Sequence, residues 1–371
     1  MCTVLCTEVG PIRRFAFIIH PLRFDDFARK YPMTRHLPEK LVQWAFKQVG
    51  PVNAGHVTGV CSPTGEELEG WLIGLPLTPQ ILLQSPYDWV LGKLLQAVKM
   101  AEELGAEIVG LGAFTKIAGD RGVTLSQKVS IPVTTGNSYT TATAVEGTLL
   151  AAARMQLDLR QVQAAVIGAT GAIGRAATKL LAEQVRHITL VARTPDDLRT
   201  LQAELQRENP EVLVDWTTDI ASAVRSADVV LAVSSATGVI VDPEDLKPGA
   251  VVTDVARPRN LSRAVMDQRR DVLVLDGGVI QVPGDRADMG FDFGFPPQMV
   301  EACMAETMIL ALEGQLECFT LGARIEVARV REIRALAEKH GFSLAGFRRF
   351  ERAIDDGEVE RVRLAARSAS A

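Results

Sequence analysis

The most regular alternation of apolar and polar segments lies in the middle of the chain. Short apolar runs predict strands there, and the stretches between them have apolar residues at helical spacing. The expected strands cover residues 162–167, 188–192, 212–216, 228–233, 250–255 and 272–275, and the expected helices cover 172–184, 196–207 and 219–226. This alternation predicts a Rossmann-like, doubly wound parallel sheet, with a ligand beyond the carboxyl ends of the strands.

The flanking regions have a less regular pattern. On the N-terminal side, the expected elements are a strand at 15–19, a hairpin of 57–61 and 69–75, a helix over 89–104, a strand at 108–114 and a long helix that ends near Met155. On the C-terminal side, they are a loop over 283–297, helices near 298–315 and 323–339, and a frayed final dozen residues. We therefore expect an α/β protein with an N-terminal α/β domain on the substrate side (1–136), a Rossmann-like domain (137–285) and a C-terminal helical region (286–371).

A glycine-rich turn joins the first central strand to the helix that follows it. Gly168 permits the tight turn, Gly171 lets the backbone approach a pyrophosphate, and Gly174 lets helix and strand pack closely. The amides at the start of the helix would then face an anion. We expect a dinucleotide to bind the whole turn, which consists of Gly168, Ala169, Thr170, Gly171, Ala172, Ile173 and Gly174. The alternative is an α/β turn that binds no nucleotide.

The end of the next strand bears on the type of dinucleotide. NAD sites usually place Asp or Glu about 20 residues after the turn, where the carboxylate binds the ribose hydroxyls. Arg193 and Thr194 occupy this place. A guanidinium pairs well with a 2′-phosphate, so the sequence favours NADP(H), with a solvated arginine as the alternative. Four residues after two later strands are expected either to line the same crevice or to form ordinary loops: Ser234, Ser235, Gly277 and Gly278.

Composition narrows the class of protein. The 371 residues are 47% hydrophobic, enough for buried cores in two or three domains, and a net charge of −5 gives no general reason to bind nucleic acid. The N-terminus has no targeting pattern, and no apolar run is long enough to span a membrane. The five cysteines form neither a disulfide framework nor a CxxC metal site. We expect a cytoplasmic protein without a bound metal.

Cys303 lies in the first of the two expected C-terminal helices. Val300, Met304 and Thr307 share one face of that helix with it. A free cysteine on an apolar helix is usually a small core residue. The pattern alone therefore favours a structural role for Cys303.

Several longer blocks of the sequence resemble the long-chain acyl-acyl carrier protein reductases, which make fatty aldehydes in cyanobacterial alkane synthesis. The order of the blocks is kept from about residue 15 to residue 341, so the resemblance covers nearly the whole chain. The blocks are LGAFT (111–115), VTTGNSYT (133–140), VIGATGAIGRA (166–176), VARTPDDLRTLQAEL (191–205), GVIVDPEDLK (238–247), PRNL (258–261), LDGGV (275–279) and EACMAETMILALEG (301–314). The TTGN and ACxAExM blocks are far more specific than the glycine turn.

The resemblance implies a covalent role for Cys303, which stands where the family has its acyl-accepting cysteine. The thiolate would take a fatty acyl group from acyl carrier protein or acyl-CoA, and NADPH would then reduce the bound thioester to an aldehyde. Glu306, one helical turn away, is a candidate for proton relay. Its negative charge would also raise the pKa of the thiol, so a structural role is equally expected.

The TTGN block (residues 134–137) is expected to position the substrate. Thr135, Gly136, Asn137 and Tyr139 are the candidate residues, and a plain helix N-cap is the alternative. Tyr139 departs from the family pattern, which has a histidine at this place. If that histidine transfers protons or binds the acyl group, Tyr139 would alter activity or substrate.

The resemblance also implies protein partners. Carrier proteins are acidic, so docking on a chain with net negative charge requires a local basic patch. The candidates for this patch are Arg13, Arg14, Arg23, Lys30 and Arg35. An enzyme that consumes the aldehyde is a further expected partner.

Two other classes of protein are compatible with these features. A shikimate-type dehydrogenase would use the same glycine turn and Arg193 but would need no thiol. A non-catalytic NADP(H)-sensing protein would bind the cofactor without turnover. An acyl adduct on Cys303 would distinguish the reductase from both.

Overall fold

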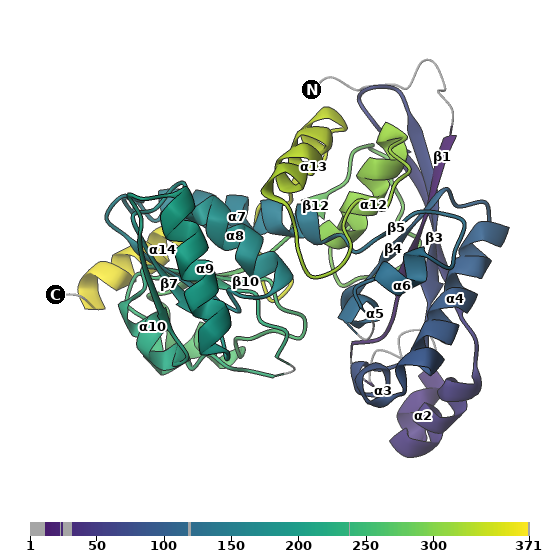
Figure 1. Ribbon diagram of the computed structural model, residues 1–371, viewed down its shortest axis with the longest axis horizontal. Helices are drawn as coiled ribbons and strands as arrows, with labels where there is room; N and C mark the ends of the chain where they lie inside the picture. The colour runs from purple at the N-terminus through teal and green to yellow at the C-terminus, as the bar shows by residue number, and fades with distance from the viewer. Residues whose placement is uncertain (1–11, 23, 25–31, 118–119, 237, 370–371) are drawn as a thin grey trace. The chain divides into compact units, whose positions relative to one another are not determined.

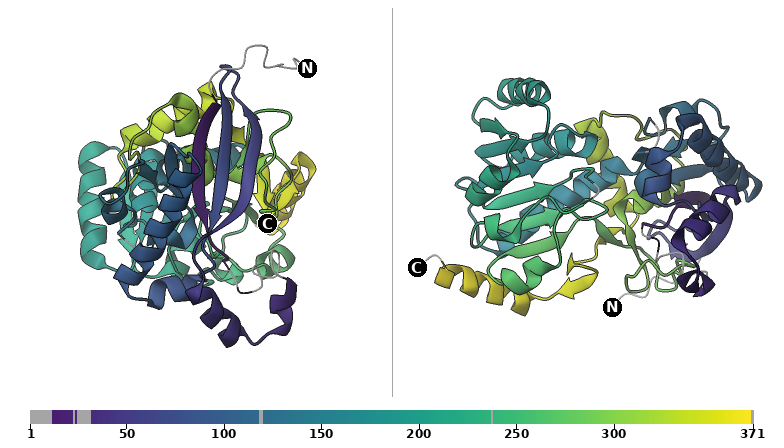
Figure 2. Two further views of the ribbon diagram at one scale, coloured as in Figure 1. Left: turned by 90° about the vertical axis from the view of Figure 1, so that its right-hand side faces the viewer. Right: turned by 90° about the horizontal axis from the view of Figure 1, so that it is seen from below.

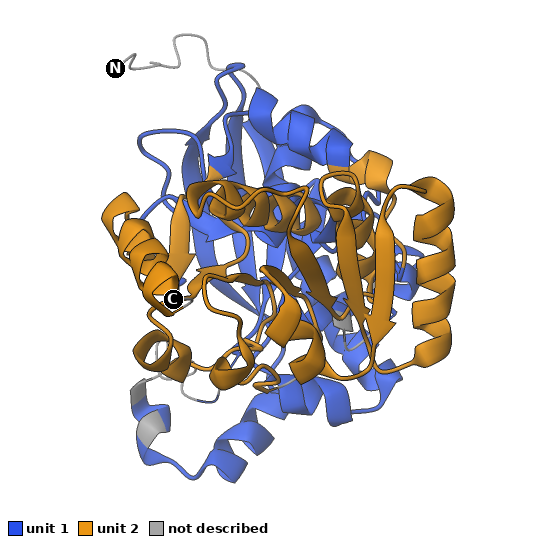
Figure 3. Cartoon of the chain, turned by 90° about the vertical axis from the view of Figure 1, so that its left-hand side faces the viewer, with its two compact units in different colours: residues 1–139, 280–323, 331–343 blue, residues 140–279, 324–330, 344–371 orange. Residues whose placement is uncertain are grey.

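The computed structural model describes residues 12–22, 24, 32–117, 120–236 and 238–369 (Figure 1). The chain forms two compact units, each built from separate stretches of sequence (Figure 3). Unit 1 consists of residues 1–139, 280–323 and 331–343, and unit 2 consists of residues 140–279, 324–330 and 344–371. Residues 286–371, expected as one helical region, therefore contribute to both units.

Unit 1 contains a five-stranded sheet with the strand order β2-β3-β1-β4-β5. The strands are β1 (Ile12–Ile19), β2 (Val52–Cys61), β3 (Glu67–Gly74), β4 (Ile108–Leu111) and β5 (Val133–Thr134). The expected hairpin is confirmed in the antiparallel pair of β2 and β3, whereas the other neighbouring pairs are parallel. The long strands β1, β2 and β3 lie side by side in the left view of Figure 2.

The helices differ widely in length. Those in the described ranges are α2 (Glu39–Gln48), α3 (Pro79–Gln84), α4 (Tyr87–Glu103), α5 (Ala113–Ile117), α6 (Val123–Ser126), α7 (Asn137–Arg154), α8 (Ala172–Ala182), α9 (Pro195–Glu208), α10 (Ile220–Ser226), α11 (Ala264–Gln268), α12 (Ala302–Glu313), α13 (Val327–Lys339) and α14 (Asp356–Ala369). Two short 3₁₀ helices are η2 (Pro32–His36) and η3 (Pro243–Asp245). No helix within these ranges has both the length and the apolar character needed to cross a bilayer.

Two helices cover opposite faces of the unit 1 sheet. α4 packs against a core that includes Val109 of β4. α12 packs on the other face, where a Cβ on Gly110 would come within 3.0 Å of the Thr307 hydroxyl. Residues 109 and 110 point to opposite faces because side chains alternate along a strand. α12 is apolar nearly all round because every residue from 304 to 312 is buried.

Unit 2 contains a six-stranded sheet with the strand order β11-β10-β9-β6-β7-β8. The strands are β6 (Gln163–Ile167), β7 (His187–Val191), β8 (Leu213–Thr217), β9 (Val229–Ala232), β10 (Val251–Asp254) and β11 (Leu273–Asp276). All neighbouring pairs are parallel, and the strands lie side by side in the right view of Figure 2. The order is that of a doubly wound Rossmann-like sheet, so the predicted fold class is confirmed. The six expected strands and the three helices between them are found to within two residues.

Two smaller sheets complete the described strands. β12 (Val279–Gln281), β13 (Met299–Glu301) and β14 (Ser343–Leu344) pair in the order β13-β12-β14. β15 (Phe347–Arg349) and β16 (Arg352–Ile354) form an antiparallel pair. Neither sheet has a clear pattern in the sequence, because strands of two or three residues are too short for one.

Several expected elements of the flanking regions have different bounds in the structure. β1 begins three residues before the expected strand, β2 begins five residues before it, and α13 begins four residues after the expected start. The strand expected at 108–114 ends at Leu111, because Ala113 takes a positive φ of 39° and begins α5. The helix expected from residue 298 begins at Ala302, because residues 299–301 pair as β13.

The expectation of a frayed C-terminus is wrong. α14 buries Val359, Val362 and Ala366. The two valines pack in a cluster with Val251 and Leu273 of the unit 2 sheet. The spacing of three and four residues between the buried positions is a helical pattern that the many charged neighbours obscure.

Candidate active site

The glycine turn lies where the strand order of the unit 2 sheet reverses, between β6 and β9. Gly168 follows β6 directly and has a φ of 86°, which favours glycine. A Cβ there would lie 2.9 Å from the Cα of Ser234, which follows β9, and Ser235 is exposed beside it. The structure therefore brings Ser234 and the turn together. In sheets of this type, the ligand-binding crevice forms at this reversal.

Gly171 and Gly174 have different surroundings in this turn. A Cβ on Gly174 would come within 3.0 Å of the Gly168 carbonyl oxygen, so the packing of α8 requires this glycine. A Cβ on Gly171 would meet only that oxygen among the described atoms, at 3.2 Å. No side chain caps the first turn of α8, so its amides are available to an anion. The turn thus fits the pyrophosphate of a dinucleotide. The remaining turn residues are buried (Ala169) or half-buried (Thr170, Ala172 and Ile173).

Gly171→Ala is expected to weaken dinucleotide binding without unfolding unit 2. The φ of −69° at Gly171 suits alanine, so the free energy of unfolding should change by less than about 1 kcal/mol. The added methyl group would stand where the pyrophosphate approaches, and the Kd for NADPH should rise at least about tenfold. Gly174→Ala, the matched variant, should instead destabilise the protein by about 1–3 kcal/mol. Fluorescence titration and urea unfolding measure the two effects, and an unchanged Kd for Gly171→Ala would contradict the assignment.

Arg193 and Thr194 follow β7, the neighbour of β6. The amides of Gly168 and Ala169 donate to the Val191 carbonyl oxygen at 2.8 and 3.1 Å, so the end of β7 is held to the glycine turn. Both Arg193 and Thr194 are exposed. Within the described ranges, Arg193 has no ion-pair partner. Its guanidinium is therefore available to a phosphate of a bound dinucleotide.

Gly277 and Gly278 lie farther along the same edge of the sheet. They follow β11, three strands from β6, which corresponds to roughly 14 Å. They line a cavity of about 470 Å³ together with Thr143, Thr253 and Phe347. The structure does not place them against the glycine turn, and their role in cofactor binding stays a prediction.

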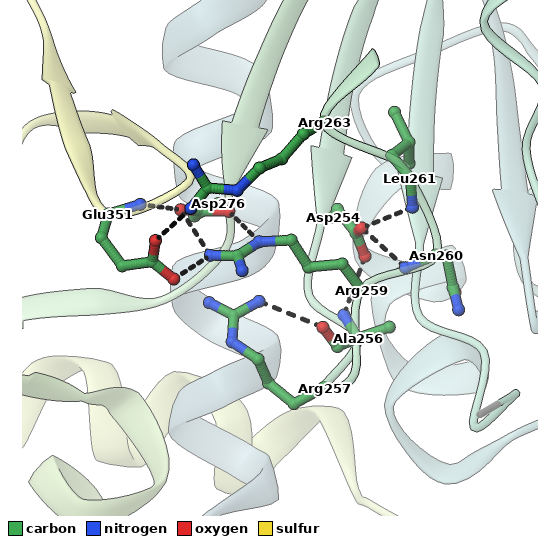
Figure 4. A network of polar contacts seen from close by, with 9 residues as sticks. All are labelled: Asp254, Ala256, Arg257, Arg259, Asn260, Leu261, Arg263, Asp276 and Glu351. Carbon is green, nitrogen blue, oxygen red and sulfur yellow. Dashed lines mark hydrogen bonds and ion pairs between the residues drawn. The ribbon is translucent and has the colours of Figure 1, made fainter. Parts of the chain in front are cut away.

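The PRNL block (258–261) is held by a buried carboxylate that sequence reasoning did not identify. Asp254, at the end of β10, is 1% exposed. It accepts hydrogen bonds from three backbone amides, those of Ala256, Asn260 and Leu261 (Figure 4). Burial raises the pKa of Asp254 to about 6, although these bonds and the charge of Arg257 lower it. The side chain thus closes the loop after β10.

A second buried carboxylate lies beside the first. Asp276, at the end of β11, is the register partner of Asp254. Arg259 donates to both oxygens of Asp276, at 3.0 and 3.1 Å, and to Glu351 at 2.8 Å (Figure 4). These contacts tie the PRNL block to β11. The signal in the sequence is an aspartate at the end of two successive apolar strands.

In unit 1, Cys303 is the second residue of α12, directly after β13. A helix N-terminus favours a thiolate. Cys303 is a free thiol and partly exposed. Burial raises the pKa of this thiol, Lys116 lowers it, and Glu301 and Glu306 raise it further. Among these charged groups, Lys116 thus favours the thiolate and the two carboxylates oppose it.

Two other described cysteines have different states. Cys318 is free and exposed. Cys61 is disulfide-bonded, although the sequence predicts no disulfide framework. Cys318 is therefore a suitable reference thiol for Cys303.

The TTGN block packs directly on Cys303. Gly136 has a φ of 72°, and a Cβ there would come within 3.0 Å of the Cα, Cβ and carbonyl oxygen of Cys303. Thr135 donates to the Thr320 carbonyl oxygen from both its amide and its hydroxyl, each at 3.0 Å. Asn137 is 5% exposed. The structure therefore brings this expected substrate-positioning block to the expected nucleophile.

Glu306 holds the same block and is fully buried. Its Oε1 accepts from the Thr134 hydroxyl at 2.6 Å, and its Oε2 accepts from the Tyr139 amide at 2.8 Å. That amide belongs to the first turn of α7, whose donors have no intrahelical acceptor. Burial raises the pKa of Glu306, while its hydrogen bonds and Lys116 lower it. These contacts are the ones expected if Glu306 has a structural role. Tyr139 is itself buried.

Lys116 belongs to this site, although sequence reasoning did not identify it. It lies on α5, shortly after β4, and its Nζ donates to the Thr135 carbonyl oxygen at 3.2 Å and to Asn137 Oδ1 at 2.8 Å. β4 and β5 are parallel neighbours, so the segments that follow them meet at one edge of the sheet. The only signal in the sequence is a charged residue directly after the apolar LGAFT block.

The doubly wound sheet and its glycine turn define the class of NAD(P)-binding oxidoreductases. A family model for shikimate / quinate 5-dehydrogenase matches residues 150–276, within unit 2. Over 331 residues, the chain is 30% identical to the long-chain acyl-[acyl-carrier-protein] reductase of Synechococcus elongatus, a match that covers 85% of this chain and 94% of that protein. The chain belongs to the family of this reductase.

Other similarities are partial or weak. The chain is 31% identical over 365 residues to the aminotransferase PigE of Serratia sp., which covers 93% of this chain but 41% of that protein. The chain thus spans less than half the length of PigE. Among solved structures, quinate dehydrogenase from Corynebacterium glutamicum in complex with NAD is 14% identical, with 88% of this chain and 99% of that one covered and a TM-score of 0.39.

Proposed function

We propose that this protein reduces a fatty acyl thioester to a fatty aldehyde with NADPH, through an acyl-enzyme on Cys303. The acyl donor is the fatty acyl thioester of acyl carrier protein or of coenzyme A. The observation that carries the proposal is a free, partly exposed Cys303 in the first turn of α12, packed against the TTGN block, in a chain of the acyl-acyl carrier protein reductase family. A cysteine that only fills a core needs neither exposure nor a helix N-terminus.

Residues of unit 1 carry the covalent step. The Cys303 thiolate attacks the carbonyl carbon of the thioester, a new carbon–sulfur bond forms, and the donor sulfur leaves and takes up a proton from water. One thioester replaces another, so the step has little net free-energy cost. Glu306 acts as a positioning residue, because its oxygens hold Thr134 and the start of α7 beside Cys303.

Residues of unit 2 would hold the cofactor. The glycine turn would bind the pyrophosphate, and Arg193 would bind the 2′-phosphate. Bound NADPH supplies the hydride that brings the acyl group to the oxidation level of an aldehyde. Cleavage of the carbon–sulfur bond would then release the aldehyde and restore the Cys303 thiolate.

Mass spectrometry after incubation with palmitoyl-CoA or palmitoyl-carrier protein, without NADPH, tests the proposal. We expect an acyl adduct on the Cys303 peptide that disappears, with formation of aldehyde, when NADPH is added. Cys318 is the control thiol in the same molecule and should stay unmodified, although it is the more exposed of the two. No adduct, or an adduct on Cys318 alone, would contradict covalent catalysis.

A shikimate-type dehydrogenase is the second candidate, favoured by the family match over residues 150–276. That match lies within unit 2 and does not include Cys303 or the TTGN block. Such an enzyme would oxidise or reduce its substrate directly and leave Cys303 unmodified. Two measurements separate the candidates. The reductase should form the acyl adduct on Cys303 and should not turn over shikimate with NADP⁺, and the dehydrogenase should do the reverse.

Arg193→Ala is expected to reduce the preference for NADPH over NADH. Losing a charge-assisted contact to the 2′-phosphate should raise the Kd for NADPH about 10–100-fold, whereas the Kd for NADH should change little. Titration of both cofactors measures the preference. Arg207→Ala removes an exposed arginine from the end of α9 and is the matched control. Equal losses for NADPH and NADH would contradict recognition of the 2′-phosphate by Arg193.

The structure describes only part of the basic patch that is expected to bind an acidic carrier protein. Arg13 pairs with Glu107 at 3.4 Å, and Arg14 pairs with Glu69 at 3.2 Å. These pairs reduce the charge that two of the expected basic residues offer. The other candidates, Arg23, Lys30 and the Arg35 side chain, lie outside the described residues.

A further inference from the structure

The Lys116 side chain bridges the two residues that flank Gly136. Its Nζ donates to the carbonyl oxygen of Thr135 at 3.2 Å and to Oδ1 of Asn137 at 2.8 Å. Both acceptors are neutral. In the part of the chain that the structure describes, no carboxylate forms an ion pair with Lys116. The positive charge therefore acts at longer range, and it lowers the pKa of both Glu306 and Cys303.

The turn that Lys116 bridges is the one that packs against Cys303. Gly136 packs against the backbone of Cys303 so closely that a single added carbon would overlap it. A side chain that fixes residues 135 and 137 therefore also fixes the turn that packs against Cys303. Half-buried Lys116 makes both contacts by charge-assisted hydrogen bonds, which are stronger than neutral ones.

Charged groups from three elements act on the Cys303 thiol. Glu301 of β13 and Glu306 of α12 both raise its pKa, in addition to the larger effect of burial. Lys116 of α5 lowers the pKa. Without Lys116, burial and both carboxylates would oppose the thiolate, and the first turn of α12 would be left to favour it.

We propose that Lys116 is a positioning residue of the Cys303 site, which holds residues 135–137 against Cys303 and supplies the positive charge that stabilises the thiolate. Its importance for turnover rests on the proposed acyl transfer to Cys303. Its effect on the thiolate does not, because the reactivity of the thiol can be measured without any acyl substrate.

The rate of alkylation of Cys303 by iodoacetamide, followed by mass spectrometry between pH 6 and pH 10, tests the inference on the full chain. Lys116→Met keeps an apolar stem and removes the charge. We expect its alkylation profile to move to higher pH by about one unit, so that the rate near pH 7 falls about tenfold. Lys116→Arg restores the charge and should return the profile toward that of the wild type. Lys128→Met, which removes an exposed lysine from the same unit, should leave the profile unchanged.

The outcomes separate this inference from the proposed function. A shifted profile in Lys116→Met without any acyl adduct in the wild type would support the role of Lys116 and contradict acyl transfer. An adduct in the wild type with coincident profiles for wild type and Lys116→Met would overturn the role of Lys116 and leave acyl transfer standing. If Lys116→Met fails to fold, Lys116→Gln against Lys116→Arg decides by the same profiles, and coincidence of those two would overturn the inference.

Discussion

Cys303→Ala is expected to lower the rate of aldehyde formation from an acyl thioester by at least about 10³-fold, because removing a nucleophile abolishes the whole covalent route. NADPH binding should stay within about twofold of the wild type, because the substitution leaves the residues proposed to hold the cofactor unchanged. The glycine turn belongs to unit 2, whereas Cys303 belongs to unit 1. NADPH oxidation in the presence of palmitoyl-CoA measures turnover, and fluorescence titration measures binding.

Two further variants make this result specific. Cys318→Ala removes the other free thiol of the described residues and should retain full activity. Cys303→Ser keeps the size of the side chain and should lose activity nearly as completely, because a hydroxyl without an adjacent base is a poor nucleophile. Retained turnover in Cys303→Ala would mean that hydride reaches the substrate directly, as in the dehydrogenase alternative.

The unit 2 fold could be predicted from the sequence because its signals are local. Its central strands are buried on both faces, so they appear as continuous apolar runs, and the helices between them have a clear apolar stripe. Gly168, Gly171 and Gly174 follow the first of these strands at the spacing of a dinucleotide turn. Each of these features can be recognised in a window of about fifteen residues.

The contacts around Cys303 could not be predicted because they join distant segments. Glu306 and Thr134 are 172 residues apart in the sequence, and Thr135 and Thr320 are 185 apart. The resemblance to a reductase family pointed to Cys303 and to the TTGN block separately. Only the parallel pairing of β4 with β5, and the packing of α12 on that sheet, puts the two together.

The role of Lys116 could not be predicted from the sequence for the same reason. A single lysine in an apolar segment is usually solvated, with its stem on the surface. Its significance depends on which backbone carbonyl and side-chain amide its Nζ meets, and both belong to the segment after the neighbouring strand. The antiparallel hairpin of β2 and β3, by contrast, was recognisable because a short turn joins its strands.

Gly136→Ala is expected to destabilise the protein by roughly 2–6 kcal/mol, the sum of backbone strain and overpacking. The φ of 72° at Gly136 is unfavourable for alanine, and the new Cβ would overlap the backbone of Cys303, which cannot move as a flexible side chain end would. Because the clash falls on Cys303 itself, the acyl adduct should be lost together with stability. Urea unfolding measures the free energy, and mass spectrometry measures the adduct.

Gly92→Ala provides the matched control for this effect. Gly92 lies within helix α4 of the same unit, and a Cβ there would meet no other atom of the described residues within 4 Å. Alanine favours the helix more than glycine does, so this variant should be more stable than the wild type by about 0.5–1 kcal/mol and should acylate normally. The two variants change the free energy of unfolding in opposite directions, because backbone atoms already fill the place of the new Cβ at Gly136 but not at Gly92. A Gly136→Ala protein as stable as Gly92→Ala would show that the TTGN block does not pack on Cys303, and would remove the geometric basis of the proposed site.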